Sequence, residues 1–165
     1  AGLEHRIGGR EHADPTGNVT YDPKNHELMT ELRAPKIDRI AADIKPIVVD
    51  GPESGDLLVV GWGSTFGAIR AGTRNASREG YSVAHAHIRH LNPFAPNLGE
   101  LFDRYDNILI PELNSGQLAT LLRSTYLVDA ISYPKIQGLP FKAAEITAKV
   151  VEIITGSGNS SEAGQ

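Results

Sequence analysis

The chain has 165 residues, of which 40% are hydrophobic and 22% charged, and its formal net charge is −4. This length suits one domain that buries most of its apolar surface. The mildly acidic balance gives no electrostatic reason to expect a nucleic acid or an anionic membrane as partner. No apolar run reaches the roughly 20 residues that span a bilayer, and no signal segment is recognisable, so we expect a cytoplasmic protein.

Cysteine is absent from the sequence. We therefore expect no disulfide framework and no cysteine-ligated zinc or iron–sulfur cluster in this chain. The sequence opens Ala-Gly-Leu-Glu without Met, and we expect it to be one domain of a longer protein.

The sequence of residues 1–45 predicts a connector followed by a helix. The first 25 residues are rich in Gly, His, Pro and charge without a sustained period, which is typical of an extended segment. A helix is expected from Asn25 to Ile44, and Pro35 should break or kink it. The apolar residues that recur at helical spacing are Leu28, Leu32, Ile37, Ile40 and Ile44.

The same region holds three histidines, His5, His12 and His26, outside any predicted sheet. A contact between a histidine and the carboxylate of Glu4 or Glu11 is an open alternative here, because both carboxylates lie close to histidines in the sequence.

Residues 46–155 alternate strands with helices. Such alternation produces right-handed crossovers and a mainly parallel sheet covered on both faces, so we predict a three-layer α/β sandwich. Residues 46–50 form a further edge strand of undetermined direction, and residues 156–165 a disordered polar tail. The predicted strands are 56–61, 81–88, 107–112 and 129–136. The predicted helices are 65–78, 97–104, 115–124 and 141–154.

The first loop at a strand's carboxyl end is Gly-Trp-Gly-Ser-Thr-Phe-Gly, residues 61–67. Ligands meet parallel sheets at these loops, and free amides at a helix start favour an anion. The spacing departs from GxGxxG by one residue, so the dinucleotide fingerprint is not met. We favour a tight turn with Ser64 or Thr65 as helix N-cap. The alternative is a nucleotide- or CoA-binding module in which Gly63 lets the backbone approach the ligand.

Two further loops carry polar side chains. In the segment from Glu112 to Leu118, Asn114 or Ser115 can cap a helix, and Glu112 is either a catalytic or interface carboxylate or an acceptor for backbone amides. His85 and His87 alternate on a strand and therefore point to one face. We favour a packed histidine pair over a metal site, because no third ligand is assured.

No nucleophile elbow, Walker A loop or HExxH motif is present. The residues by themselves therefore predict a docking or nucleotide-binding domain without a catalytic set.

An ordered set of short motifs nevertheless resembles one family. The central motifs are Val60–Thr65 with Gly67, Ile88–Arg89 followed by Leu91–Phe94, and Glu112–Asn114 with Gly116–Leu118. The flanking motifs are Gly2–His5, Gly9, His26, Met29, Arg33 with Lys36, and Ile136–Phe141. Together, over about residues 2–154, they resemble the C-terminal part of the α subunit of 2-oxoacid:ferredoxin oxidoreductases, close to the 2-oxoglutarate type.

The resemblance implies a domain similar to the transketolase C-terminal domain. It also implies an enzyme that converts 2-oxoglutarate and CoA to succinyl-CoA and CO2 while reducing ferredoxin. Thiamine diphosphate, Mg and the iron–sulfur cluster would then lie in other domains, and the partners would be the rest of the α subunit, a β subunit and ferredoxin. The equivalent domain of another thiamine diphosphate enzyme is the remaining alternative.

From the loops and the resemblance we predict binding or interface residues, and neither a catalytic residue nor a metal ligand. The role expected of this domain is assembly and enclosure of an active site formed elsewhere. The candidates are Glu4, His5, Gly63, Ser64, Thr65, Arg89, Glu112, Asn114, Gly116 and Gln117.

Overall fold

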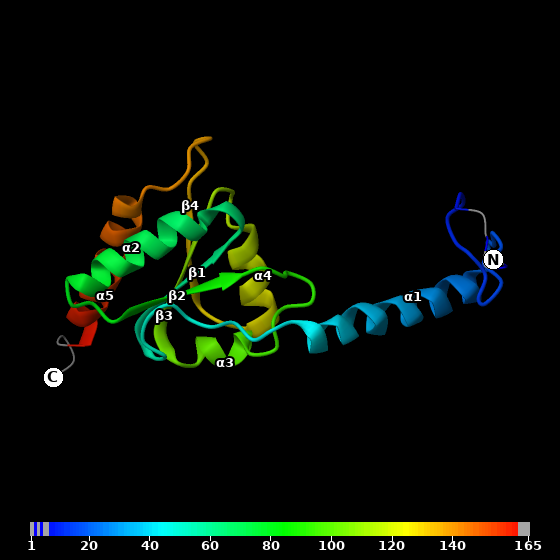
Figure 1. Cartoon of the computed structure of the whole chain (residues 1–165), viewed down its shortest axis with the longest axis horizontal. Coiled ribbons are helices and arrows are strands. Elements are labelled where there is room, and N and C mark those ends of the chain that lie inside the picture. The colour runs from blue at the N-terminus through cyan, green and yellow to red at the C-terminus, as the bar shows by residue number, and fades with distance from the viewer. Residues whose placement is uncertain (1, 3, 5–6, 162–165) are drawn as a thin grey trace. The chain divides into compact units, whose positions relative to one another are not determined.

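The structure is a computed structural model that describes residues 2, 4 and 7–161. The chain divides into two compact units, Ala1–Ile44 (unit 1) and Lys45–Gln165 (unit 2). Figure 1 labels the helices and strands of both units.

Unit 1 consists of an N-terminal segment, helix α1 (Pro23–Asp38) and a 3-10 turn, η1 (Arg39–Asp43). Asp22 caps α1, since its carboxylate accepts a hydrogen bond of 3.1 Å from the amide of Lys24. The predicted break at Pro35 is wrong, because α1 continues through this residue. Proline removes only one amide from the helix, and α1 has no buried residue, so the carbonyl that loses its partner can bond to water.

Unit 2 contains a four-stranded parallel sheet in the order β2-β1-β3-β4, which confirms the predicted α/β class. The strands are β1 (Gly55–Trp62), β2 (Val83–Ile88), β3 (Tyr105–Glu112) and β4 (Ala130–Pro134). Beside β2, residues 46–50 make a single antiparallel bridge, in which Asp50 and His85 exchange backbone hydrogen bonds of 2.9 and 3.0 Å. The direction of this edge segment, which the sequence left open, is therefore antiparallel.

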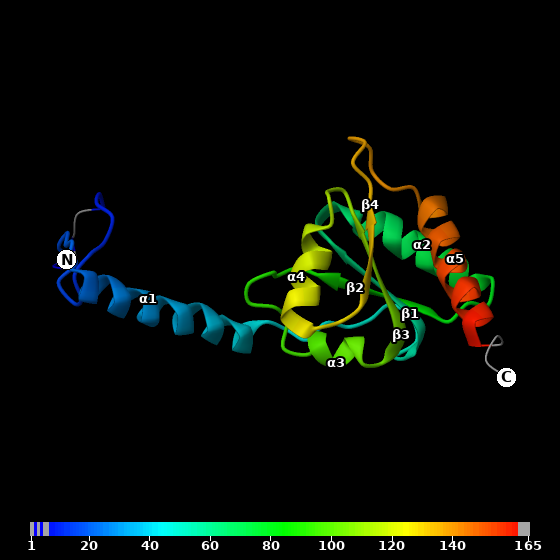
Figure 2. The same ribbon diagram turned by 180° about the vertical axis from the view of Figure 1, so that it is seen from behind.

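Helices cover both faces of the sheet. Figures 1 and 2 show α2 and α5 on one side and α3 and α4 on the other. Alternate β1 residues enter the two cores: Leu57 and Val59 pack with the α2/α5 layer, while Leu58 and Val60 pack with the α3/α4 layer. The helices are α2 (Phe66–Arg78), α3 (Leu98–Phe102), α4 (Gln117–Tyr126) and α5 (Ala143–Ser161).

Helix α5 continues past Ile154, where its apolar period was expected to end, as far as Ser161. Residues 156–161 of the predicted tail are thus helical in the structure. Residues 162–165 lie outside the described part of the chain.

The contact between α2 and α5 depends on a glycine. A Cβ atom on Gly72 would lie 2.6 Å from Cβ of Ile146 and 2.8 Å from the carbonyl oxygen of Ala143. The hydroxyl of Thr147 also donates to the Gly72 carbonyl at 3.1 Å. The backbones of the two helices therefore approach too closely for any side chain at this position.

Gly72→Ala should lower the free energy of unfolding of the chain by about 1–3 kcal/mol, because the added methyl forces α2 and α5 apart. Gly67→Ala is the matched control in the same helix, since its Cβ would meet nothing within 4 Å. The control should be neutral or stabilising by less than about 1 kcal/mol. Urea denaturation measures both, and equal stability of the two variants would contradict the close packing at Gly72.

Candidate functional site

Three strands end beside one another at the carboxyl edge of the sheet, the usual ligand-binding edge of such folds. Two neighbouring pockets lie there and share Trp62 and Gly63; we call them together the strand-end site. The first, of about 490 Å³, is lined by Trp62, Gly63, Phe66, His87, Ile88, Arg89 and Leu91. The second, of about 160 Å³, is lined by Trp62, Gly63, Ser64, Thr65, Leu113 and Asn114.

The structure brings five of the predicted site residues to these pockets: Gly63, Ser64, Thr65, Arg89 and Asn114. Sequence reasoning missed the apolar lining, above all Trp62, Phe66 and Leu113. The sequence signal that could have identified these residues is a large apolar side chain at a strand end or at the start of the following helix. Such positions are usually polar where the loop is solvated.

The turn after β1 is closed by a side-chain hydroxyl. Thr65 Oγ1 donates to the Trp62 carbonyl at 2.8 Å and accepts from the Trp62 amide at 3.2 Å. Thr65 occupies the N-cap position of α2, but its side chain makes no cap bond to the helix because the hydroxyl is bound to Trp62. Gly63 has a φ of +57° and open space beside its Cα, so the backbone conformation, and not close packing, requires glycine there.

Glu112 organises the start of α4. Its fully buried carboxylate accepts hydrogen bonds from the amides of Leu118 at 2.8 Å and Ala119 at 3.0 Å, and from the side chain of Asn114 at 3.2 Å. The helix dipole and these three donors compensate for the burial of a charge. Of the two roles considered for Glu112, the geometry is that of a carboxylate accepting backbone amides.

The residues after Glu112 complete this turn. Asn114 Oδ1 accepts from the amides of Gly116 at 2.9 Å and Gln117 at 3.0 Å. Gly116 has a φ of +92°, and a Cβ there would lie 2.8 Å from Oγ of Ser132. Gly116 and Gln117 thus belong to the turn that holds Asn114, and neither lines the two pockets of the strand-end site.

His85 and His87 form an aromatic cluster with Phe66. The ring centroids lie 4.9 to 5.7 Å apart, and His85 is only 3% exposed. His85 Nε2 and His87 Nδ1 have no hydrogen-bond partner among the described residues. Burial, followed by the neighbouring His87, lowers the pKa of His85 to about 4, and burial also lowers the pKa of His87. Both rings are therefore neutral at neutral pH, as packed side chains.

Across the described part of the chain, no group of three His, Cys, Asp or Glu side chains is placed to hold a metal ion. Next to the histidines, Asp50 instead pairs with two arginines of α2. Arg70 Nε lies 2.8 Å from Oδ2 of Asp50, and Arg74 Nη2 lies 3.1 Å from the same oxygen. The hydrogen bonds from Arg70 and then Arg74 lower the pKa of Asp50. The sequence hint was the spacing of the arginines, four residues apart on one helix face.

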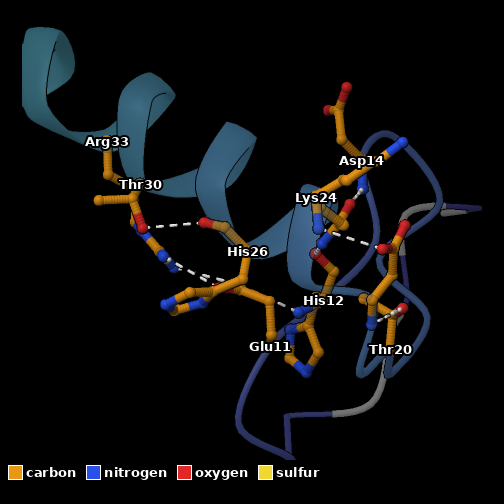
Figure 3. Close-up of polar contacts among 10 residues, drawn as sticks. Glu11, His12, Asp14, Thr20, Lys24, His26, Thr30 and Arg33 are labelled. Atoms are coloured by element: carbon orange, nitrogen blue, oxygen red, sulfur yellow. Dashed lines mark hydrogen bonds and ion pairs between the residues drawn. The ribbon is translucent and has the colours of Figure 1, made fainter.

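In unit 1, one buried carboxylate ties the N-terminal segment to α1 (Figure 3). Glu11 is 7% exposed; its Oε2 lies 2.6 Å from His26 Nδ1, and Arg33 donates to its two oxygens at 3.2 and 3.1 Å. The hydrogen bonds from Arg33 and then His26 lower the pKa of Glu11 to about 2. We call Glu11, His26 and Arg33 the Glu11 clasp.

Of the two carboxylates considered for a histidine contact, Glu11 contacts His26. Glu4 instead accepts a hydrogen bond of 2.7 Å from the amide of Gly2. His5 lies outside the described residues. A second tie lies beside the clasp, where the Asn25 side chain bonds to the amide of Asp14 at 3.0 Å and the carbonyl of His12 at 2.9 Å.

The family's predicted closing segment connects β4 with α5. Lys135 Nζ holds its two ends together through bonds of 2.8 Å to the Glu145 carboxylate and 3.1 Å to the Pro140 carbonyl. Phe141 is buried, whereas Ile136 and Leu139 are 71% and 62% exposed. Lys135 thus joins the two ends of the loop, and the apolar side chains of Ile136 and Leu139 within the loop are exposed.

Comparisons with known proteins define first the class of fold. A split-gene transketolase, described as an inactive β4 tetramer, matches 68% of this chain and 43% of its own with a TM-score of 0.52 and 16% identity. Unit 2 therefore has a transketolase-like α/β fold. No protein-family model matches the chain, and no helix in the described residues is long and apolar enough to cross a membrane.

Two closer relatives define the family. The 2-oxoglutarate oxidoreductase subunit KorA of Mycobacterium tuberculosis is 51% identical over 146 residues, which is 88% of this chain and 22% of KorA. The 2-oxoglutarate:ferredoxin oxidoreductase of Magnetococcus marinus, solved with 2-oxoglutarate, coenzyme A and succinyl-CoA bound, is 32% identical with a TM-score of 0.81, over 92% of this chain and 27% of that chain. In sequence and fold, the chain corresponds to one domain of a 2-oxoacid:ferredoxin oxidoreductase α subunit, which confirms the resemblance drawn from the motifs.

The chain spans about a fifth of the length of KorA and about a quarter of the solved Magnetococcus marinus chain. Most of each relative therefore has no counterpart in the 165 residues described above.

Glu112→Gln should lower the free energy of unfolding by about 1–3 kcal/mol, because its NH2 group replaces one of the two oxygens that accept backbone amides of α4 and cannot accept that bond. Urea denaturation at pH 7 measures this change. The control is Glu100→Gln, which alters an exposed carboxylate and should change stability by less than about 0.5 kcal/mol. An unchanged Glu112→Gln protein would show that the carboxylate does not stabilise the helix.

The chain should lose stability as the pH falls from about 6.5 to about 4. In this window the unfolded chain binds a proton at residue 85 that the folded chain excludes, so stability rises with pH. The contribution of His85 is on the order of 3 kcal/mol over the window.

Urea midpoints measured at several pH values test this dependence. His85→Gln should flatten the profile between pH 6.5 and pH 5, above the range in which the carboxylates titrate. His90→Gln, at an exposed position, should retain the wild-type slope. An equal slope in all three proteins would refute a buried, neutral His85.

Proposed function

We propose that this chain is the structural and assembly domain of the α subunit of a 2-oxoglutarate:ferredoxin oxidoreductase. The whole enzyme converts 2-oxoglutarate and CoA to succinyl-CoA and CO2 and reduces ferredoxin. The observation that carries this proposal is the 51% identity to KorA over 88% of the chain.

The chemistry of the described residues supports a role in assembly. The buried carboxylate of Glu112 is occupied by two backbone amides and by Asn114. His85 is buried and keeps its ring neutral, with its pKa lowered to about 4. These side chains stabilise the edge of the sheet, and none of them is poised as a nucleophile or as a base exposed to a substrate.

The residues present do not fit the cofactors of such an enzyme. The sequence has no cysteine to ligate an iron–sulfur cluster. Among the described residues, no group of three His, Cys, Asp or Glu side chains is placed to hold a metal ion by itself. We therefore propose that other domains hold these cofactors.

The strand-end site is then an interface with the rest of the α subunit or with a β subunit, in a cytoplasmic complex. Arg89 is exposed and lines the larger pocket beside Trp62 and Phe66. An arginine next to exposed aromatic surface is a frequent centre of protein interfaces. Gly63, Ser64, Thr65 and Asn114 would shape the adjoining contact.

The test is the reduction of a viologen dye by the full α and β chains, dependent on 2-oxoglutarate and CoA. Deleting the segment that corresponds to this chain should abolish both activity and association of α with β. Arg89→Glu should weaken association at least about tenfold, because it places a repelling charge in the interface. Association is measured by sedimentation of the two chains at varied concentrations.

Arg104→Glu is the matched control, since Arg104 is exposed at the opposite, amino-terminal end of β3. This variant should assemble like the wild type. If the complete complex reduces no dye with 2-oxoglutarate or any other 2-oxoacid, the proposed function fails. If the deleted α chain still assembles and retains activity, the role in assembly fails.

A further inference from the structure

A further pocket opens between β2, the edge segment 46–50 and the first turns of α2; we call it the histidine pocket. Its volume is about 320 Å³. It adjoins the larger pocket of the strand-end site, since Phe66 and His87 line both. The histidine pocket is lined by Val48, Val49, Asp50, Phe66, Arg70, His85 and His87.

The histidine pocket contains polar groups that the chain itself leaves unbonded. His85 is only 3% exposed, yet its Nε2 has no hydrogen-bond partner among the described residues, and the same holds for Nδ1 of His87. Buried polar side-chain atoms in folded proteins are nearly always hydrogen-bonded. A neutral imidazole offers one N–H donor and one acceptor nitrogen. Two unpartnered rings that line one pocket therefore indicate a binding site for a ligand.

Arg70 is positioned at the pocket without the use of its terminal nitrogens. Its Nε donates to Oδ2 of Asp50 at 2.8 Å, and its guanidinium lies 5.7 Å from the centre of the Phe66 ring. Its two terminal NH2 groups make no hydrogen bond to another described residue. Guanidinium nitrogens bind the oxygens of carboxylates and phosphates in pairs. An arginine held in this way is therefore suited to an oxyanion.

The charges around the pocket favour an anion. Both oxygens of Asp50 are occupied, Oδ2 by Arg70 and Oδ1 by Arg74 Nη2 at 3.2 Å. Arg89 lines the adjoining pocket, and burial and then the charge of Arg89 lower the pKa of His87. Three arginines and one carboxylate thus lie around the rings, and these four groups carry an excess of two positive charges.

We propose that the histidine pocket binds a phosphate group, either free or at the end of a small monoester. Arg70 donates to it from its terminal nitrogens, and His85 and His87 each donate a ring N–H. A phosphomonoester has about two negative charges and three strong acceptor oxygens, which match the excess charge and the three donor side chains. A carboxylate has one charge and two oxygens. The site is formed by this chain alone, so it does not depend on the proposed function.

Titration of the chain with inorganic phosphate tests the site, followed by the NMR signals of the histidine ring protons at pH 7 and constant ionic strength. The signals of His85 and His87 should shift saturably, whereas that of the exposed His90 should not. Sodium chloride at the same ionic strength is the blank. Phenyl phosphate is the second probe: tighter binding than inorganic phosphate identifies a monoester as the ligand, and weaker binding identifies free phosphate.

A first pair of variants tests the arginine. Arg70→Gln should weaken phosphate binding at least about tenfold, because it removes the charge-assisted donors. Arg78→Gln is the matched control, since Arg78 lies on the same helix about 12 Å further along its axis. A charge at that distance is largely screened, so the control should bind within about twofold of the wild type.

A second pair of variants tests the mouth of the pocket. Val48 lines the pocket and is 87% exposed, so its substitution leaves the fold intact. Val48→Glu should weaken phosphate binding at least about tenfold through repulsion between like charges, whereas the neutral Val48→Gln, of the same size, should bind within about twofold of the wild type. This pair tests the site even if Arg70→Gln does not fold.

Three outcomes would overturn the proposal. The first is the absence of any saturable shift of the two histidine signals. The second is equal phosphate affinity in the wild type and in Val48→Glu, which would place the anion elsewhere on the chain. The third is tighter binding of acetate than of phosphate under the same conditions, which would assign the pocket to a carboxylate.

Discussion

Burial of the central strand β1 on both faces is the constraint from which the rest of unit 2 follows. Leu57, Leu58, Val59 and Val60 are all completely buried, so each face of the sheet must be covered. A parallel sheet meets this requirement because every crossover places a helix on one face. The same crossovers bring the carboxyl ends of β1, β2 and β3 to one edge, where the two pockets of the strand-end site form.

At that edge, polar groups are used for structure. Glu112 and Asn114 cap the start of α4, Thr65 closes the turn after β1, and Asp50 fastens the edge segment to α2 through Arg70. Glu112, Asn114, Thr65 and Asp50 are therefore already hydrogen-bonded within the domain. Arg89 is exposed at this edge, where it lines the larger pocket together with Trp62 and Phe66.

Polar contacts, and not apolar packing, organise the described part of unit 1. Among the described residues its contacts are charged and polar and centre on the buried carboxylate of Glu11, while Leu28 and Leu32 are exposed. Charge-assisted bonds define the geometry of a segment well, yet they add little net stability where the partners are solvated. The Glu11 clasp therefore gives the described part of unit 1 a definite local structure without an apolar core.

The sequence by itself determined the alternating strands and helices, the α/β class and the family, because these depend on local apolar periodicity and on the order of short motifs. Only the tertiary structure decided the antiparallel bridge at Asp50, the choice of Glu11 by His26 and the pairing of Asp50 with Arg70 and Arg74. It also decided that α1 continues through Pro35. The paired residues are 15 to 35 positions apart, and which of several charged groups meet across such a separation depends on how the chain folds back. A local sequence pattern does not determine which of these groups pair.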